Sequence, residues 1–402
     1  MPKWAIPLTI AAAAVFLISI PIMLVSAAAA RNKDSSSLLD DTRPMISVAF
    51  AGNSMQFYND LPRFMEVLSD NRISQNSCLH ADATIVNLLQ TGNGMYNKFN
   101  TDAAKLDIDG YSSNDNDILY DYGACTVHQL VFGTDRTIYN NWLYLNESKS
   151  MTDDYFGTAP SYSDGTNPCY EDPDYLQYTT SRFRANPPQW DYLILNDGVR
   201  APGDATSRAA ALETLAQAYV KWFNQTSSSV VPVFLHTHAY WTDFRNMTGL
   251  VDVPTFTSVT YEGYRQYAAL LAQQLPSTQP PRIAPVGIAF LVVWEEDVDL
   301  WYKLFHYDEV HASPHGTFLQ GCVLHGTLFG SMPPAAAAVD DDVSTLFSRA
   351  RRMQPPTHKQ KPMPTYEEAV YLRNVAERVA VQGYLPDSLT LYDNGESFET
   401  LD

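Results

Sequence analysis

The chain has 402 residues, enough for one large domain or two small ones, and apolar residues make up 45% of it, so a substantial core can form. Its formal charge of −19 comes without any long run of lysine and arginine. This excess of negative charge argues against nucleic acid and against an anionic membrane surface as partners. Its plainest consequence is solubility.

The N-terminal stretch has the length of a membrane anchor. Residues 1–30 carry a single charged side chain, that of Lys3. A signal peptide has an apolar core of about 7–15 residues, whereas about 20 residues span a bilayer. The stretch 6–25 has the spanning length, although Pro7 and Pro21 interrupt it, and the alanines that end it satisfy the small-residue rule for cleavage. We expect a signal anchor, with a cleaved signal peptide as the alternative.

Glycosylation patterns and cysteines favour a lumenal or extracellular body. Three N-x-[ST] patterns follow the apolar segment, beginning at Asn146, Asn224 and Asn246. The four cysteines are Cys78, Cys125, Cys169 and Cys322. They allow three disulfide pairings, with four buried free thiols as the alternative, and none has the C-x-x-C spacing of a zinc site. The sequence therefore predicts a glycoprotein of the secretory pathway, either anchored in the membrane or secreted.

A polar, serine-rich linker over residues 31–44 precedes a folded domain over residues 45–385. The domain opens with a short apolar run at 45–51, which is typical of a fully buried strand. Residues 59–62, Asn-Asp-Leu-Pro, then resemble a helix start, with a capping side chain and proline in the first turn. An irregular insertion covers 131–188.

Strands and helices alternate along the rest of the domain. Further strands are expected at 83–89, 190–195, 230–235 and 282–286. Helices are expected at 207–223, 261–275, within 289–305, at 318–329 and at 366–381, and a mobile tail at 386–402. This order predicts an α/β fold in three α/β/α layers around a mostly parallel sheet. In such sheets a site lies at the carboxyl ends of the strands.

Two short strings far apart in the chain fit one active site. Gly52-Asn53-Ser54 directly follows the first strand, and Asp308-Glu309-Val310-His311 lies near the end of the folded region. A serine needs a neighbouring base to become a nucleophile at neutral pH, and that base needs an orienting carboxylate. Ser54, His311 and Asp308 are therefore the candidate catalytic residues. The plainer alternatives are a helix N-cap for Ser54 and a solvated loop pair for the other two.

The order and spacing of these strings resemble the SGNH, or GDSL-like, hydrolases, in the branch that carries G-N-S in place of G-D-S. The resemblance covers roughly residues 45–382. It implies a flavodoxin-like SGNH fold and two-step acyl transfer without a cofactor. Ser54 would attack an ester carbonyl, His311 would move the proton, and Asp308 would orient the imidazole.

The tetrahedral intermediate of acyl transfer needs hydrogen-bond donors aimed at its oxyanion. The backbone N–H of Ser54 is one candidate. The resemblance adds a glycine N–H and an asparagine side chain, for which Gly94 and Asn196 stand in plausible positions, each just beyond an expected strand. This chain departs from the family's G-x-N-D block: Leu195 precedes Asn196 and Asp197, and the glycine is absent. Both residues are equally well suited to turns.

A second set of polar residues supports a rival mechanism. His236 and His238 lie at i and i+2 after a strand, so they can face the same way and hold a metal ion together with His306, His315 or an aspartate. We do not favour this site, because the helical H-E-x-x-H context is missing. Tyr240 and Trp241 nearby have the rings to stack on a sugar, although core packing is commoner for aromatic residues.

These features together predict a serine esterase acting on a small acyl ester, with O-acetyl groups on carbohydrate as the candidate substrate by family analogy. No cofactor or metal is implied by this reading. Three alternatives stay open: the metal-dependent hydrolase at His236 and His238, a catalytically silent surface protein that binds a glycan, and acyl transfer to a sugar acceptor.

Overall fold

The computed structural model describes residues 45–79, 83–86, 88, 190–225, 230–241, 252–334, 343–350 and 361–392. The compact unit that holds all of them begins at Met45. The predicted anchor, the linker, the insertion over 131–188 and the end of the tail lie outside the described residues. Within the described ranges, no helix combines the length and the apolar character needed to cross a membrane.

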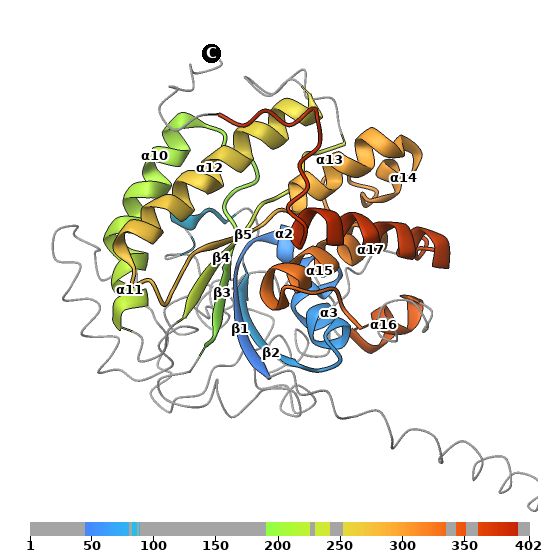
Figure 1. Cartoon of the computed structure of the whole chain (residues 1–402), viewed down its shortest axis with the longest axis horizontal. Coiled ribbons are helices and arrows are strands. Elements are labelled where there is room, and N and C mark those ends of the chain that lie inside the picture. The colour runs from blue at the N-terminus through green and yellow to red at the C-terminus, as the bar shows by residue number, and fades with distance from the viewer. Residues whose placement is uncertain are drawn as a thin grey trace, which may run out of the picture. The chain divides into compact units, whose positions relative to one another are not determined.

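The described strands form one parallel sheet of five strands (Figure 1). They are β1 (Ile46–Gly52), β2 (Ile73–Leu79), β3 (Tyr192–Leu195), β4 (Val231–Leu235) and β5 (Arg282–Ala284). Their spatial order is β2-β1-β3-β4-β5, and every pairing is parallel. The chain therefore changes direction across the sheet between β1 and β3, the kind of switch point at which ligands bind in open α/β sheets.

Strand β1 lies inside the sheet, between β2 and β3, and both of its faces are buried. Val48 and Phe50 belong to one apolar cluster, whereas Ala49 and Ala51 belong to another on the opposite face. Successive side chains of a strand point to opposite faces, so an uninterrupted apolar run is what a strand covered on both sides requires. The strand expected at residues 45–51 is thereby confirmed.

Helices cover both faces of the sheet (Figure 1). On one face, side chains of the sheet form an apolar cluster with four helical elements: α10 (Ala205–Thr214), η5 (Leu215–Tyr219), α11 (Val220–Gln225) and the C-terminal half of α12 (Val253–Gln274). The cluster on the other face is shared with α3 (Leu61–Leu68), α13 (Val286–Glu296), α14 (Val298–Lys303), α15 (Pro314–Phe329), α16 (Val343–Ala350) and α17 (Tyr366–Ala380). The two short elements α2 (Ser54–Phe57) and η1 (Tyr58–Asp60) join β1 to α3.

The predicted α/β architecture with a parallel sheet is confirmed. The later strands begin or end within a few residues of their predicted bounds, and the helix expected at 207–223 is present with one π-helical turn, η5, in its middle. The helices expected at 261–275, 318–329 and 366–381 correspond to α12, α15 and α17. The helix expected within 289–305 is divided into α13 and α14 at Asp297, whose side chain accepts from Leu300 N.

The strand predicted at residues 83–89 is wrong. Residues 85, 86 and 88 are helical, and Leu88 N donates to Thr84 O at 2.9 Å. Short apolar runs suit a buried helix as well as a buried strand, so periodicity alone did not distinguish them. The strand that follows β1 in the chain is instead β2, at one edge of the described sheet. Its sequence, Ile-Ser-Gln-Asn-Ser-Cys-Leu, is mostly polar. Helix α16 was not predicted either.

The chain stays packed beyond residue 385, where the sequence predicted a mobile tail. Thr390 N donates to Ser258 Oγ on α12 at 3.0 Å, and Arg265 of the same helix donates to Tyr392 O. The packed part of the domain therefore extends through the described residues 386–392.

Candidate active site

Ser54 stands at the carboxyl end of β1, on the turn that enters helix α2. Asn53 is the N-cap of that helix, and its Oδ1 accepts from Met55 N at 3.0 Å. Capping by a short polar side chain satisfies one of the donors left open in a first helical turn. Ser54 itself is the first helical residue and 5% exposed. The N-cap role considered for Ser54 thus falls to Asn53.

The amide of Asn53 fixes the turn to its neighbours. Its Nδ2 donates to Ala83 O at 2.8 Å and to Asp197 O at 3.0 Å. Its Oδ1 also accepts from Asn196 Nδ2 at 2.7 Å. Every polar atom of this side chain is therefore engaged, which gives the turn before Ser54 a single arrangement.

Gly52 allows this close approach. A Cβ atom at position 52 would lie 1.8 Å from Asn196 Oδ1 and 2.5 Å from Gln56 Nε2. Gln56 Nε2 also donates to Asn196 Oδ1 at 2.7 Å. Strands β1 and β3 thus meet at a polar junction that has no room for a side chain at residue 52.

The second half of the site is a closed loop between α14 and α15. Phe305 and Ala312 form an antiparallel bridge, and His306 N donates to His311 O at 2.7 Å. Ser313 N closes the base of the loop on Leu304 O at 2.8 Å. At the tip, Glu309 has a φ of 62°, a left-handed conformation that non-glycine residues adopt mainly in tight turns.

The loop brings His311 to Ser54. Ser54 Oγ lies 2.7 Å from His311 Nε2, although 257 positions separate the two residues. His311 Nδ1 lies 2.8 Å from Asp308 Oδ2. Both separations are hydrogen-bond distances, and they connect a hydroxyl, an imidazole and a carboxylate in series. This is the arrangement by which a serine gains a general base and the base gains an orienting partner.

Asp308 is held as a carboxylate. Burial opposes its ionisation, but the imidazoles of His306 and His311 and the backbone N–H of His311 outweigh burial and hold the pKa of Asp308 well below its usual range. Asp308 Oδ1 accepts from Val310 N at 3.1 Å and from His311 N at 2.9 Å. Because an ionised carboxylate only accepts, the Nδ1 proton of His311 faces Asp308 and Nε2 is left to accept from Ser54.

The ring of Tyr58 contacts both histidines of the loop. The ring of Tyr58 lies parallel to that of His311, with centroids 3.7 Å apart, and meets the ring of His306 edge-on at 5.6 Å. His306 Nδ1 is 3.7 Å from Asp308 Oδ2, at ion-pair distance. Burial, followed by the charge of Asp308 and a hydrogen bond to it, raises the pKa of the Tyr58 phenol.

Asn59 links the serine turn directly to the histidine loop. Its Nδ2 donates to Ala312 O at 2.9 Å and to Thr317 Oγ1 at 2.8 Å. The residue has a φ of 54°, a left-handed conformation in which asparagine is among the favoured non-glycine residues. The sequence predicted Asn59 as part of the start of α3, whereas its side chain joins two halves of the site.

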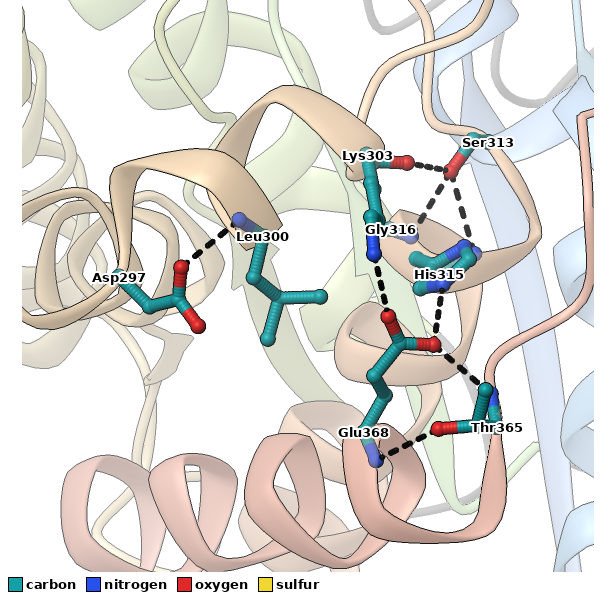
Figure 2. Close-up of polar contacts among 8 residues, drawn as sticks. All are labelled: Asp297, Leu300, Lys303, Ser313, His315, Gly316, Thr365 and Glu368. Atoms are coloured by element: carbon teal, nitrogen blue, oxygen red, sulfur yellow. Dashed lines mark hydrogen bonds and ion pairs between the residues drawn. The ribbon is translucent and has the colours of Figure 1, made fainter.

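Glu368 at the start of α17 holds both ends of the histidine loop (Figure 2). Its Oε1 accepts from Lys303 Nζ at 2.7 Å, and its Oε2 pairs with His315 Nε2 at 3.0 Å. Lys303 ends α14 and His315 lies in the first turn of α15, so one carboxylate bridges the two helices that flank the loop. Ser313 adds a further tie, because its Oγ donates to Lys303 O.

The three predicted oxyanion donors have different surroundings. Ser54 N–H is at the first position of α2, where a backbone donor has no acceptor within its own helix. Asn196 is fully buried, and its Nδ2 donates to Asn53 Oδ1 and to Asp197 O, the latter at 3.1 Å. The amide of Asn196 therefore organises the serine turn in this arrangement. Gly94 lies outside the described residues.

The histidines of the rival mechanism point to different neighbours. His236 Nε2 lies 3.1 Å from Thr260 Oγ1 on α12, whereas His238 stacks on Phe290 of α13 with ring centroids 4.2 Å apart. Burial lowers the pKa of His236 to about 3 and that of His238 to about 4, so both rings are neutral at pH 7. Across the described ranges, no three histidine, cysteine or acidic side chains are grouped in a way that could hold a metal ion.

The predicted aromatic pair lies beside the histidine loop. Tyr240 is partly buried and packs against the apolar core next to Phe256, with ring centroids 6.1 Å apart. Trp241 N donates to Glu309 O at 2.9 Å, and the ammonium of Lys361 lies 5.7 Å from the Trp241 ring centroid. Trp241 is thus tied to the loop tip, and a sugar-stacking role for it stays a prediction.

Cys322 is a free thiol buried in α15, and burial raises its pKa to about 12. It is therefore an inert core residue. Cys125 and Cys169 lie outside the described residues, so a disulfide among the other cysteines stays a prediction.

Sequence reasoning missed Asp197, Tyr58 and Glu368. Asp197 is fully buried beside Asn196 and accepts from Ile85 N at 2.9 Å and from Tyr267 Oη at 2.8 Å. Tyr58 follows Ser54 by four positions, a spacing that places it one helical turn away and was the available signal. For Glu368 the signal was the Thr365-x-x-Glu368 capping box, which marks the helix start but not its contact with the loop.

Comparison with known proteins adds little to this picture. No family model matches the chain, and no curated protein matches it. Among solved structures, the chain is similar to a DUF4886 family protein from Bacteroides uniformis ATCC 8492, with 13% sequence identity and a TM-score of 0.45. The alignment covers 86% of this chain and 97% of that one.

Proposed function

We propose that this protein is a serine esterase of SGNH type, in which Ser54 is the nucleophile, His311 the general base and Asp308 the orienting carboxylate. The observation that carries this proposal is the unbroken series of Ser54 Oγ to His311 Nε2 at 2.7 Å and His311 Nδ1 to Asp308 Oδ2 at 2.8 Å. A hydroxyl that merely caps a helix needs neither of the other two groups.

The reaction follows from this geometry. Ser54 Oγ attacks the ester carbonyl while its proton passes to His311 Nε2, and Asp308 stabilises the imidazolium that forms. The tetrahedral intermediate collapses when His311 returns the proton to the departing alcohol, which leaves an acyl-serine. Water, deprotonated by His311, then releases the acid and restores Ser54. The backbone N–H of Ser54 is the main donor that we assign to the oxyanion in this mechanism.

The fold supports the same proposal. The strand order β2-β1-β3-β4-β5 is the order of flavodoxin-like sheets, and Ser54 follows β1 at the reversal between β1 and β3. We assign the finer fold, a flavodoxin-like SGNH hydrolase domain in three layers, on this order together with the motifs. The fold alone would not specify a function, so the assignment depends on the site.

The substrate and the location belong to the proposal as well. We propose a small acyl ester, with O-acetyl groups on carbohydrate as the first class to test. We also propose that the domain lies on the lumenal or extracellular side, anchored or secreted, because its glycosylation patterns follow an apolar N-terminal segment.

Hydrolysis of p-nitrophenyl acetate tests the chemistry. Ser54→Ala removes the nucleophile and should abolish turnover, leaving at most the residual acceleration that an oxyanion site supplies without its triad. Ser207→Ala is the matched control and should retain the wild-type rate. Ser207 lies on α10, which covers the sheet face opposite to the one covered by α14 and α15. Equal rates in Ser54→Ala and wild type would remove Ser54 from the mechanism. Loss of turnover with a chelator and recovery with zinc would favour the metal alternative.

A further inference from the structure

We propose that Tyr58 is a positioning residue that holds the imidazole of His311 in its working orientation, an inference that rests on the proposed function. The two rings are parallel, with an interplanar angle of 0° and centroids 3.7 Å apart. Such a contact covers one face of the imidazole. Tyr58 touches the base and not the reacting atoms, so its contribution to the reaction passes through His311.

The imidazole needs this support because its work depends on two bonds made by opposite edges of one ring. Nε2 must face Ser54 Oγ while Nδ1 faces Asp308. The terminal torsion of a histidine side chain has broad minima, so a ring without a neighbour can turn away from both partners. A second ring lying flat against it obstructs that rotation and lowers the entropy lost when the reacting geometry is reached.

The stacked ring also suits the charge that develops during the reaction. His311 becomes an imidazolium when it takes the serine proton, and the face of a phenol ring is the negative part of its quadrupole. Burial raises the pKa of the Tyr58 phenol, and the charge of Asp308 and a hydrogen bond to its carboxylate raise that pKa further. Tyr58 therefore remains a neutral donor to Asp308 while its ring faces His311.

A single backbone bond sets Tyr58 relative to the nucleophile. Tyr58 is the C-cap of the one-turn helix α2, and its N–H donates to Ser54 O. The next residue, Asn59, is bound to Ala312 beside His311. The backbone at Tyr58 is therefore held on one side by Ser54 and on the other by the bond between Asn59 and Ala312. These two attachments place the ring of Tyr58 between the two halves of the site.

Steady-state kinetics of three variants test the proposal. Tyr58→Leu removes the ring and should lower kcat by about 10- to 50-fold while KM stays within about twofold, as expected for an interaction used in the transition state. Tyr58→Phe keeps the ring and should retain kcat within about threefold. Tyr366→Leu, at a 60% exposed tyrosine on α17, is the matched control and should match wild type. An unchanged kcat in Tyr58→Leu, or an equal loss in Tyr58→Phe, would overturn the role given to the ring.

A spectroscopic measurement separates this proposal from the proposed function. In wild type, the stacked phenol ring should shift the His311 ring protons upfield, and Tyr58→Phe should preserve that shift while Tyr58→Leu removes it. His311 resonances that do not change in Tyr58→Leu would refute the stacking whatever the activity. If the shift behaves as expected while wild type neither hydrolyses esters nor reacts with a fluorophosphonate, the esterase function fails and the placement of Tyr58 stands.

Discussion

Asn59 binds Ala312 through a hydrogen bond of 2.9 Å from its side-chain Nδ2 to the backbone carbonyl, and so ties the serine turn to the residue that follows His311. The two residues are 253 positions apart in the chain. A second bond of the same amide, to Thr317 Oγ1, extends the tie to helix α15. The separation of Ser54 and His311 is therefore set by a direct contact between their segments, in addition to the packing of the whole domain.

Asn59→Asp tests this tie with almost no change in shape. A carboxylate cannot donate to the Ala312 carbonyl, so this partly buried hydrogen bond is replaced by repulsion between two acceptors, at a cost of about 1–3 kcal/mol in the free energy of unfolding. We expect kcat to fall at least tenfold. Asn59→Gly is the companion variant, because glycine accepts the left-handed backbone and isolates the loss of the amide. A wild-type kcat in both variants would show that this hydrogen bond does not determine the separation of Ser54 and His311.

Asp308→Asn should leave the fold intact and lower kcat by about 10³- to 10⁴-fold, because an amide in this place favours the wrong tautomer of His311. The prediction uses the ionised state of Asp308, whose pKa its neighbours hold well below the usual range. Stopped-flow or steady-state hydrolysis measures kcat, and circular dichroism checks the fold. A loss of less than tenfold would mean that Asp308 is a bystander in the loop.

Gly52→Ala should disrupt the turn that carries Ser54. The added Cβ would lie 1.8 Å from Asn196 Oδ1, so the junction between β1 and β3 must open, at a cost of about 1–3 kcal/mol of stability. Activity should fall with it. Gly203→Ala is the matched control, since its Cβ would meet its nearest neighbours at 3.3 Å. Denaturant unfolding of both variants gives the comparison, and equal stabilities would contradict the predicted clash.

Glu368→Gln should reveal a pH-dependent clamp on the histidine loop. Burial opposes ionisation of Glu368, but Lys303, Thr365 N–H and His315 outweigh it and lower the carboxyl pKa from 4.5 to about 2. A carboxyl whose pKa is lower in the folded state stabilises the fold above its unfolded pKa and loses that contribution as the pH falls toward its folded pKa. Wild type should thus exceed Glu368→Gln in unfolding free energy at pH 7, with the difference shrinking between about pH 4.5 and 2.

Arg378→Gln is the control for the Glu368 experiment. Arg378 lies on the same helix α17 as Glu368, but it pairs with Glu296 of α13 at 2.8 Å and not with the loop. It should affect stability slightly and leave kcat unchanged, whereas Glu368→Gln should lower kcat by severalfold. A stability difference between wild type and Glu368→Gln that is constant from pH 7 to pH 2 would contradict the assigned ionisation.

Asp197→Ala should be the most destabilising of these changes. The side-chain oxygens of Asp197 accept from Ile85 N, Gly198 N and Tyr267 Oη in a fully buried position. Their removal leaves these donors without an acceptor, at a cost of about 3–5 kcal/mol in the free energy of unfolding. Thermal and denaturant unfolding measure the loss. A cost below about 1 kcal/mol would show that water replaces these oxygens without penalty.

The sequence was most informative where a residue's environment is set locally. The apolar run of β1 identifies a buried strand, and the polar residues directly after it mark the carboxyl end of the sheet, so Ser54 could be placed from sequence. Asp308 and His311 could be paired because three residues of a turn bring them together. The amphipathic helices followed from their spacing in the same way.

What the sequence did not reveal depends on contacts between distant segments. Strand β2 is at the edge of the described sheet, where a polar strand is tolerated, so its composition carries little strand signal. Tyr58 and Asn59 have their roles only because the loop of His311 folds against them. Glu368 resembles an ordinary capping residue until α17 is placed across the ends of α14 and α15.

Covalent labelling of Ser54 is the most direct test of the central claim, that the folded chain turns this hydroxyl into a nucleophile. Wild type, Ser54→Ala and His311→Ala would be treated with a fluorophosphonate, and the modified peptide identified by mass spectrometry. We predict stoichiometric modification of wild type at Ser54, none of Ser54→Ala and very slow modification of His311→Ala. A wild-type protein that remains unlabelled, or that is labelled at another serine, would contradict the account.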